Sequence, residues 1–112
     1  MVRAVTEDIQ VQLKKGVLEL CVLSLLSRGD NYAYEIASKL TNGIGMGEGT
    51  IYPLMRRMQS DRLVKTYLVE SASGPPRKYY KLTAAGLAAL EAQRAEWTEF
   101  EFAVRKIIGD SA

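Results

Sequence analysis

A chain of 112 residues, 47% of them hydrophobic, is long enough for one compact domain with a small core and too short for two. Its single cysteine, Cys21, excludes a disulfide framework and a cysteine-rich zinc site, and its net charge of +2 by itself says little about partners. The apolar run from Gly16 to Leu26 contains Glu19 and is too short to span a bilayer, and no secretory signal pattern opens the chain. We therefore expect a cytoplasmic protein without a metal or a cofactor.

The first expected helix begins at an N-cap, Thr6, and runs to about Arg28. In its first half Ile9, Leu13 and Val17 recur at intervals of four and form one apolar stripe. In its second half apolar residues cover nearly every face. The second half is therefore predicted to be core, and the first half to be amphipathic.

A second helix is predicted from about Tyr32 to Leu40, capped by Asp30 or Asn31. The glycine-rich segment Thr41–Gly49 follows and is predicted to be a turn between two packed helices. It has neither the Gly-Lys-Ser/Thr ending of a phosphate-binding loop nor the GxGxxG spacing of a dinucleotide site. The segment therefore does not indicate nucleotide chemistry.

A third helix follows this turn and ends within residues 61–63. At the helical period one of its faces is apolar and the opposite face is polar and basic. The apolar face holds Ile51, Leu54, Met55 and Met58, and the opposite face holds Tyr52, Pro53, Arg56 and Ser60, with Arg57 and Gln59 flanking. Arginine has a planar fork that suits phosphates and guanine edges, so the free face is typical of DNA recognition. A solvated face with two incidental arginines is the alternative for the helix taken alone.

A β-hairpin is predicted next, with strands over Val64–Val69 and Arg77–Leu82 and a long irregular tip, ESASGPP, between them. Arg77 and Lys78 beside two prolines suggest a stiff basic finger that lies along a phosphate backbone or enters a minor groove. Residues 50–81 hold seven basic and two acidic side chains, a local charge of +5 in a chain of +2. Concentration of charge on one helix and one hairpin favours a polyanionic partner.

Four motifs resemble the PadR-like family of winged-helix transcriptional regulators: LKKGVLELCVLSLL, DNYAYEIASKL, GTIYPLMRRMQSDRLV and GPPRKYYKLTAAGLAAL. The resemblance spans about residues 13–90 and implies a mainly α fold with a small β-hairpin, a winged helix-turn-helix. It also implies a homodimeric repressor on a pseudo-palindromic double-stranded DNA operator. The DNA-binding positions that it implies are Tyr34, Thr50, Tyr52, Pro53, Arg56 and Arg57, with Arg77 and Lys78 in the wing. The helical wheel supports Tyr52, Pro53 and Arg56 independently.

A last helix is predicted from the N-cap Thr83 to about Ile108. One helix after the wing resembles the short subgroup of the family, some of whose members bind aromatic drug-like molecules. We therefore divide the chain into a DNA-binding domain, residues 1–82, whose first helix also contributes to the dimer, and a C-terminal dimerisation helix, residues 83–112. The expected dimer interface comprises Ile9, Leu13, Val17, Leu90, Trp97, Phe100, Val104 and Ile108.

Several alternatives remain open at this stage. Trp97 is either packed in the dimer interface or, with Phe100, forms a platform for a small aromatic effector. An enzyme is disfavoured because the chain has no histidine and no recognisable nucleophile–base arrangement, so no catalytic residue is assigned. A winged helix that binds protein or RNA without operator specificity is the second alternative.

Overall fold

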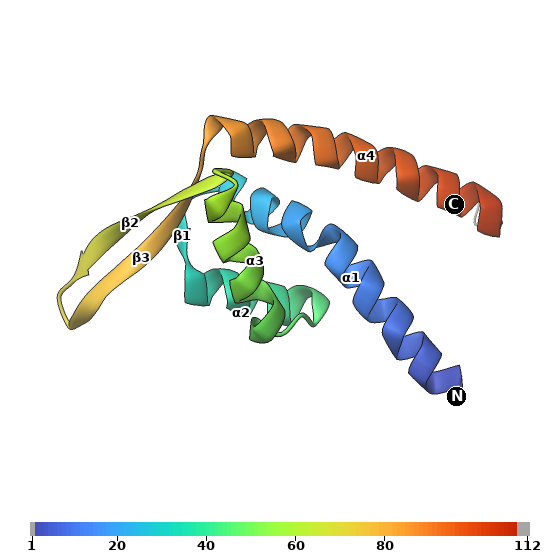
Figure 1. Ribbon diagram of the computed structural model, residues 1–112, viewed down its shortest axis with the longest axis horizontal. Coiled ribbons are helices and arrows are strands. Elements are labelled where there is room, and N and C mark those ends of the chain that lie inside the picture. Colours follow the sequence, from blue (N-terminus) through green and yellow to red (C-terminus); the bar gives the residue numbers. More distant parts are fainter. Residues whose placement is uncertain (1, 110–112) are drawn as a thin grey trace.

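The computed structural model describes the backbone of residues 2–109 and the side chains of residue 10 and residues 12–109. Four helices and a three-stranded antiparallel sheet form a winged helix-turn-helix, as the sequence predicts. A hairpin projects from one side of the helical unit, and the last helix extends to the other side (Figure 1). The elements are α1 (Val2–Ser27), β1 (Asn31–Tyr32), α2 (Ala33–Ile44), α3 (Glu48–Ser60), β2 (Val64–Ser71), β3 (Gly74–Leu82) and α4 (Ala84–Ile108).

The first helix starts earlier than predicted. Helix α1 begins at Val2, so Thr6 lies inside the helix and the predicted N-cap is wrong. Residues 2–5 contain no glycine or proline, and nothing in them breaks the helical backbone before Thr6. The side chain of Ile9, a predicted interface residue, lies outside the described side chains.

The prediction for the second helix also requires correction. Helix α2 begins at Ala33, close to the predicted start, but its N-cap position is Tyr32, without a capping side-chain hydrogen bond, and not Asp30 or Asn31. Asn31 and Tyr32 form the short strand β1, which pairs antiparallel with β3. The sheet order is therefore β1-β3-β2. Helix α2 continues to Ile44, where Gly45 adopts a left-handed conformation with φ of 69° and closes the helix.

The predicted turn Thr41–Gly49 is correspondingly too long. Its first four residues belong to α2 and its last two to α3, so residues 45–47 make the connection. The Thr41 hydroxyl donates a hydrogen bond to the carbonyl of Met46 at 2.8 Å and holds the turn closed. Such a short connection fixes the angle between α2 and α3.

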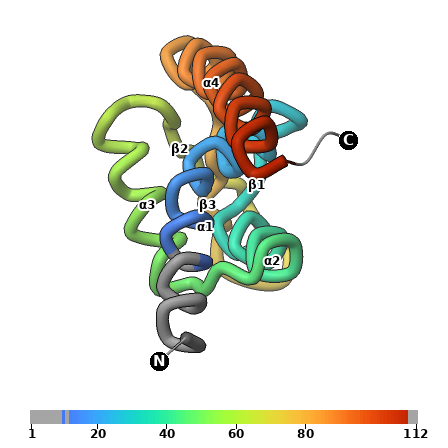
Figure 2. The backbone as a smooth tube through the Cα atoms, turned by 90° about the vertical axis from the view of Figure 1, so that its right-hand side faces the viewer, coloured from blue at the N-terminus to red at the C-terminus, as the bar shows by residue number. Residues whose placement is uncertain are grey.

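The apolar face of α3 packs into the core as predicted. Ile51, Leu54, Met55 and Met58 are all buried. They meet buried side chains of α1 and α2, while Val64 and Tyr80 at the base of the hairpin join the same cluster. Helix α1 runs between α2 and α3 in the side view (Figure 2). The face of α3 opposite to the core is thereby left free.

The hairpin has a shorter tip than predicted. Strands β2 and β3 stay paired out to Ser71 and Gly74, with an irregularity between Val69 and Ser71. Pro75 and Pro76 lie between the paired residues Gly74 and Arg77, at this irregularity in the ladder with β2. Proline is tolerated there because it cannot donate to a regular ladder but is compatible with a bulge.

Helix α4 begins where the sequence predicts. The Thr83 hydroxyl accepts a hydrogen bond from the Gly86 amide at 3.0 Å, which caps the helix. A β-carbon at Gly86 would overlap the carbonyl oxygen of Leu63, so this contact requires glycine. Helix α4 joins the core through Leu90, which is 3% exposed. Toward its C-terminal end the helix diverges from α1 (Figure 1).

Candidate nucleic-acid interface

The free face of α3 consists of two stripes. Tyr52 and Arg56 are four residues apart and share one stripe, whereas Thr50, Pro53 and Arg57 share the other. Arg56 is exposed and forms no ion pair with a described residue. Its guanidinium is therefore available to an external acceptor.

The first stripe adjoins α2 and the hairpin. The pKa of Tyr52 is raised by burial of its phenol, and then by the potentials of Glu48, Tyr34 and Tyr80. Tyr34 on α2 is 65% exposed. The Tyr52 phenol therefore keeps its proton at neutral pH, and the hydroxyls of both tyrosines can donate to a phosphate or base acceptor. The predicted residues Tyr34, Tyr52 and Arg56 are consistent with one shared surface.

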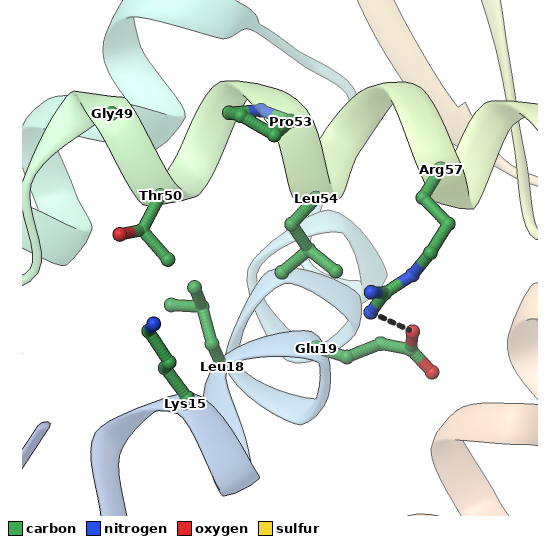
Figure 3. Close-up of a pocket in the computed structure, with 8 residues that line it drawn as sticks. All are labelled: Lys15, Leu18, Glu19, Gly49, Thr50, Pro53, Leu54 and Arg57. Atoms are coloured by element: carbon green, nitrogen blue, oxygen red, sulfur yellow. Dashed lines mark ion pairs between the residues drawn. The ribbon is translucent and has the colours of Figure 1, made fainter. Parts of the chain in front are cut away.

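The second stripe faces α1 across a cavity of about 360 Å³. The side chains of Thr50 and Lys15 face each other across it, and Arg57 extends from α3 toward Glu19 (Figure 3). The Arg57 guanidinium lies 3.7 Å from the Glu19 carboxylate. Thr50 and Arg57 were predicted DNA contacts, and here they lie beside α1 rather than beside the hairpin.

Glu19 connects three helices. Its second carboxylate oxygen accepts a hydrogen bond of 2.6 Å from the Gln93 side-chain amide of α4, while the first pairs with Arg57 of α3. Sequence reasoning used Glu19 only to exclude a membrane span and missed this role. A lone acid in an apolar run was the available signal, but its partners are distant in sequence.

Aromatic rings fasten the hairpin to the helical unit. The Tyr79 ring lies 5.5 Å from that of Tyr32 in β1 and 5.8 Å from that of Tyr67 in β2, measured between centroids. The Tyr67 hydroxyl donates a 2.6 Å hydrogen bond to Asp30, and this bond is the main reason why the Tyr67 pKa is raised. We call Asp30, Tyr32, Tyr67 and Tyr79 the wing clamp. Sequence reasoning did not identify it.

The two predicted wing cations lie on opposite faces of β3. The Arg77 guanidinium is 4.5 Å from the centroid of the Tyr32 ring, against the wing clamp. The Lys78 ammonium is 5.7 Å from the centroid of the Tyr80 ring, on the other face. Successive strand residues point in opposite directions, so a phosphate backbone that lies along one face of β3 cannot contact both side chains equally.

The described residues hold no cluster of ligands that suits a metal ion. No helix within residues 2–109 is long and apolar enough to cross a membrane.

Comparison with known proteins gives a consistent result. The family model described as "Transcriptional regulator PadR-like family" matches residues 22–92. The crystal structure of a PadR-like transcriptional regulator from Bacillus cereus is 40% identical with a TM-score of 0.79, and the match covers 87% of this chain and 96% of that one. A PadR family regulator from Eggerthella lenta is 34% identical with a TM-score of 0.80, over 95% of this chain and 90% of that one.

A more distant structure, Bacillus subtilis PadR in complex with operator DNA, shares the fold. It is 22% identical with a TM-score of 0.62, and the match covers 69% of this chain and 46% of that one.

Proposed function

Because this chain belongs to the transcriptional regulator PadR-like family, we propose that it is a homodimeric, ligand-responsive repressor that binds a pseudo-palindromic DNA operator. The observation that carries the proposal is the free face of α3, on which Arg56 is exposed and without an ion-pair partner among the described residues. Such a regulator acts in the cytoplasm, where bacterial DNA lies.

In this proposal α3 enters the major groove and the hairpin contacts the backbone beside it. Arg56 and Tyr52 read base edges, with Tyr34, Thr50, Pro53 and Arg57 near the backbone. Arg77 and Lys78 supply positive charge from the wing. The local charge of +5 over residues 50–81 and the operator complex of the Bacillus subtilis neighbour support this arrangement.

The proposed dimer forms through α4 and the first half of α1. Helix α4 exposes large apolar side chains on its outer part, and one protomer leaves them uncovered. Leu13 is exposed and Val17 half-buried on the facing part of α1. Leu90 belongs to the protomer core, so the interface that we propose omits it. The α4 side chains in the interface are Trp97, Phe100, Val104 and Ile108.

The proposed effector site lies between α1 and α4. A cavity of about 370 Å³ there is lined by both Trp97 and Phe100, which can stack on a planar ring. Gln93, which binds Glu19, lines the same cavity. An effector bound in this cavity contacts Gln93, whose side chain binds the Glu19 carboxylate that pairs with Arg57.

We retain residue 83 as the boundary between the DNA-binding domain, 1–82, and the dimerisation helix, 83–112.

The test compares a twofold-symmetric fragment of the promoter region with a scrambled fragment of equal length at fixed salt. A repressor binds the symmetric fragment roughly a thousandfold or more tightly. Equal affinity would overturn the proposal and favour a winged helix that binds without operator specificity. Binding of both fragments at low salt is by itself uninformative, because any basic surface binds DNA under that condition.

A further inference from the structure

The two faces of the hairpin have different neighbours. One face carries Tyr67 and Tyr79, whose rings form the wing clamp together with Tyr32 of β1. Side chains alternate along paired strands, so the opposite face carries a separate set of cross-strand pairs. These pairs are Val64 with Leu82, Thr66 with Tyr80, and Leu68 with Lys78. We call the surface that they form the helix-side face of the hairpin.

The helix-side face continues the free face of α3. At its base Val64 and Tyr80 are buried in the same core cluster that holds the apolar face of α3. Further out, the Gln59 side-chain amide of α3 donates a hydrogen bond of 3.4 Å to the Thr66 hydroxyl of β2. Gln59 flanks the free face of α3, so a ligand that covers this free face also meets the helix-side face of the hairpin.

Leu68 is the exposed apolar residue of the helix-side face. It is 70% exposed, and its cross-strand neighbour is Lys78, whose ammonium lies 5.7 Å from the centroid of the Tyr80 ring. An exposed leucine gains free energy when a partner removes it from water. A leucine beside a lysine therefore suits a partner whose surface is apolar and bordered by negative charge. The minor groove of DNA is such a surface, because sugars form its walls and phosphates form its rims.

We propose that Leu68 enters the minor groove of the operator beside the segment read by α3, while Lys78 contacts a phosphate at the rim of that groove. The inference rests on the proposed function and adds an apolar contact to it. Apolar side chains in a minor groove pack against sugars and base edges and can open a base step. Guanine carries an amino group in this groove that an apolar side chain cannot pair, so Leu68 favours base pairs without it. The wing thereby contributes to the choice of sequence as well as to affinity.

Glu70 sets the outer limit of this contact. It is exposed and lies two residues beyond Leu68, at the irregularity of the strand pairing. A carboxylate repels phosphates, so the duplex leaves the hairpin before the tip. The pair of Leu68 and Lys78 is therefore the outermost contact that we assign.

Matched substitutions on the two faces of β2 test the proposal. Leu68→Thr and Val69→Thr each replace an exposed apolar side chain with a residue of high strand propensity, but only Leu68 lies on the helix-side face. We expect Leu68→Thr to weaken operator binding about threefold to tenfold, and Val69→Thr to weaken it less than about twofold. Leu68→Met keeps the apolar contact and should bind within about twofold of the unaltered protein. Equal effects of the two threonine variants would overturn the proposal.

The salt dependence of binding separates Leu68 from Lys78. Leu68→Thr should weaken binding by the same factor at every salt concentration, because it removes no phosphate contact. Lys78→Gln should instead reduce the slope of log affinity against log salt by about one. A reduced slope in Leu68→Thr would show that the substitution disturbs phosphate contacts, and the apolar contact would be refuted.

Inosine in place of guanine identifies the groove. An inosine–cytosine pair lacks the minor-groove amino group but keeps the major-groove edge of a guanine–cytosine pair. Such pairs are placed in the segment under the wing, which hydroxyl-radical footprinting locates. The unaltered protein should prefer the inosine duplex by at least about threefold, and Leu68→Thr should lose this preference. Equal affinity of the unaltered protein for both duplexes would overturn the proposal, as would a preference that persists in Leu68→Thr.

The contact and the proposed function fail in different ways. Equal affinity of the unaltered protein for symmetric and scrambled fragments contradicts the proposed function. Specific binding that Leu68→Thr leaves unchanged contradicts only the minor-groove contact. Sedimentation of Leu68→Thr without DNA tests for a second copy of this chain at the same surface. A changed association state would assign Leu68 to that contact and overturn the proposal.

Discussion

Arg56 and Lys78 carry different parts of the proposed interaction with DNA. Arg56 is on the free face of α3 and Lys78 on the hairpin. Arg56→Ala should cost about 1–3 kcal/mol on the operator and relax specificity at one base pair, whereas Lys78→Ala should weaken all sequences about equally. Binding measured on a panel of single-base operator variants separates the two effects. If both variants behave alike, Arg56 contacts only phosphate.

Glu19 forms an ion pair with Arg57, and a DNA phosphate must compete with this carboxylate for the guanidinium. Glu19→Gln keeps an amide oxygen for Gln93 but removes the charge that holds the guanidinium. The Arg57 side chain is 65% exposed, so the ion pair itself contributes at most about 0.5 kcal/mol to stability after screening. We therefore expect nearly unchanged unfolding and about a twofold gain in affinity for every DNA sequence.

A double-mutant cycle with Arg57→Gln provides the control for this prediction. The gain from Glu19→Gln should vanish when residue 57 is already neutral. A gain that persists in the double variant would mean that Glu19 repels the DNA directly.

Sequence patterns predicted the buried face of α3, because the helical period determines it. They did not predict the Glu19–Arg57 pair, because α1, α3 and α4 meet only in the tertiary fold.

The junction between the hairpin and α4 depends on one glycine. Gly86→Ala places a β-carbon against the Leu63 carbonyl, which belongs to the backbone and cannot move aside alone. We expect a loss of about 1–3 kcal/mol in the free energy of unfolding, measured with urea. Gly43→Ala in α2 meets no atom within 4 Å and is the matched control. It should be neutral or stabilising by up to about 1 kcal/mol. Equal stability of the two variants would contradict the tight junction.

The wing clamp should determine where the hairpin lies. Tyr67→Phe keeps the ring beside Tyr79 and removes the hydrogen bond to Asp30. We expect faster amide exchange in β2 and weaker operator binding with little change in global unfolding, because the bond is at the surface. Asp30→Asn keeps an acceptor and should resemble the unaltered protein. Identical exchange in both variants would show that the bond does not hold the hairpin.

The wing clamp should also respond to pH with a defined sign. The Tyr67 pKa lies above the usual value for a phenol because the protonated hydroxyl donates to Asp30. The contribution of this bond is therefore fully present below the ordinary phenol pKa, about 10, and is lost as pH rises through the raised pKa. Amide exchange in β2, corrected for intrinsic pH dependence, should be flat near neutrality and accelerate only in strongly alkaline solution. Faster amide exchange already near neutral pH would contradict the assignment of this response to the Tyr67 hydroxyl.

Element boundaries divide into those that local chemistry determines and those that it does not. Thr83 and Gly109 bound α4 as predicted, because a hydroxyl cap and a left-handed glycine act within a few residues. Strand β1 was missed because two residues have no detectable period and pair only through the distant β3. The hairpin tip was predicted too long because its prolines lie at an irregularity of the strand pairing that only the register reveals.

At the scale of the whole molecule, the outer half of α4 should govern association. Phe100 is 61% exposed, and Phe100→Asp replaces proposed interface area with a charge. We expect dimer affinity to fall more than about tenfold, with operator binding weakened in parallel. Analytical ultracentrifugation measures the first effect and a titration with operator the second. Leu68→Asp, at an exposed apolar position in the wing, is the control that should leave association intact. Unchanged association of the Phe100 variant would contradict the proposed interface.

Anchoring α4 at one end makes it a lever arm. The helix is fastened near Gly86 and Leu90 and then diverges from α1, and its 25 residues span about 37 Å. From Leu90 to Ile108 the helix spans about 27 Å, so a rotation of about 5° at the fastened end displaces the far end by about 2 Å, a motion of the size seen in allosteric helix shifts. In the proposed dimer, a small rotation of α4 about the Gly86 contact therefore changes the distance between the two operator half-sites that the dimer can contact.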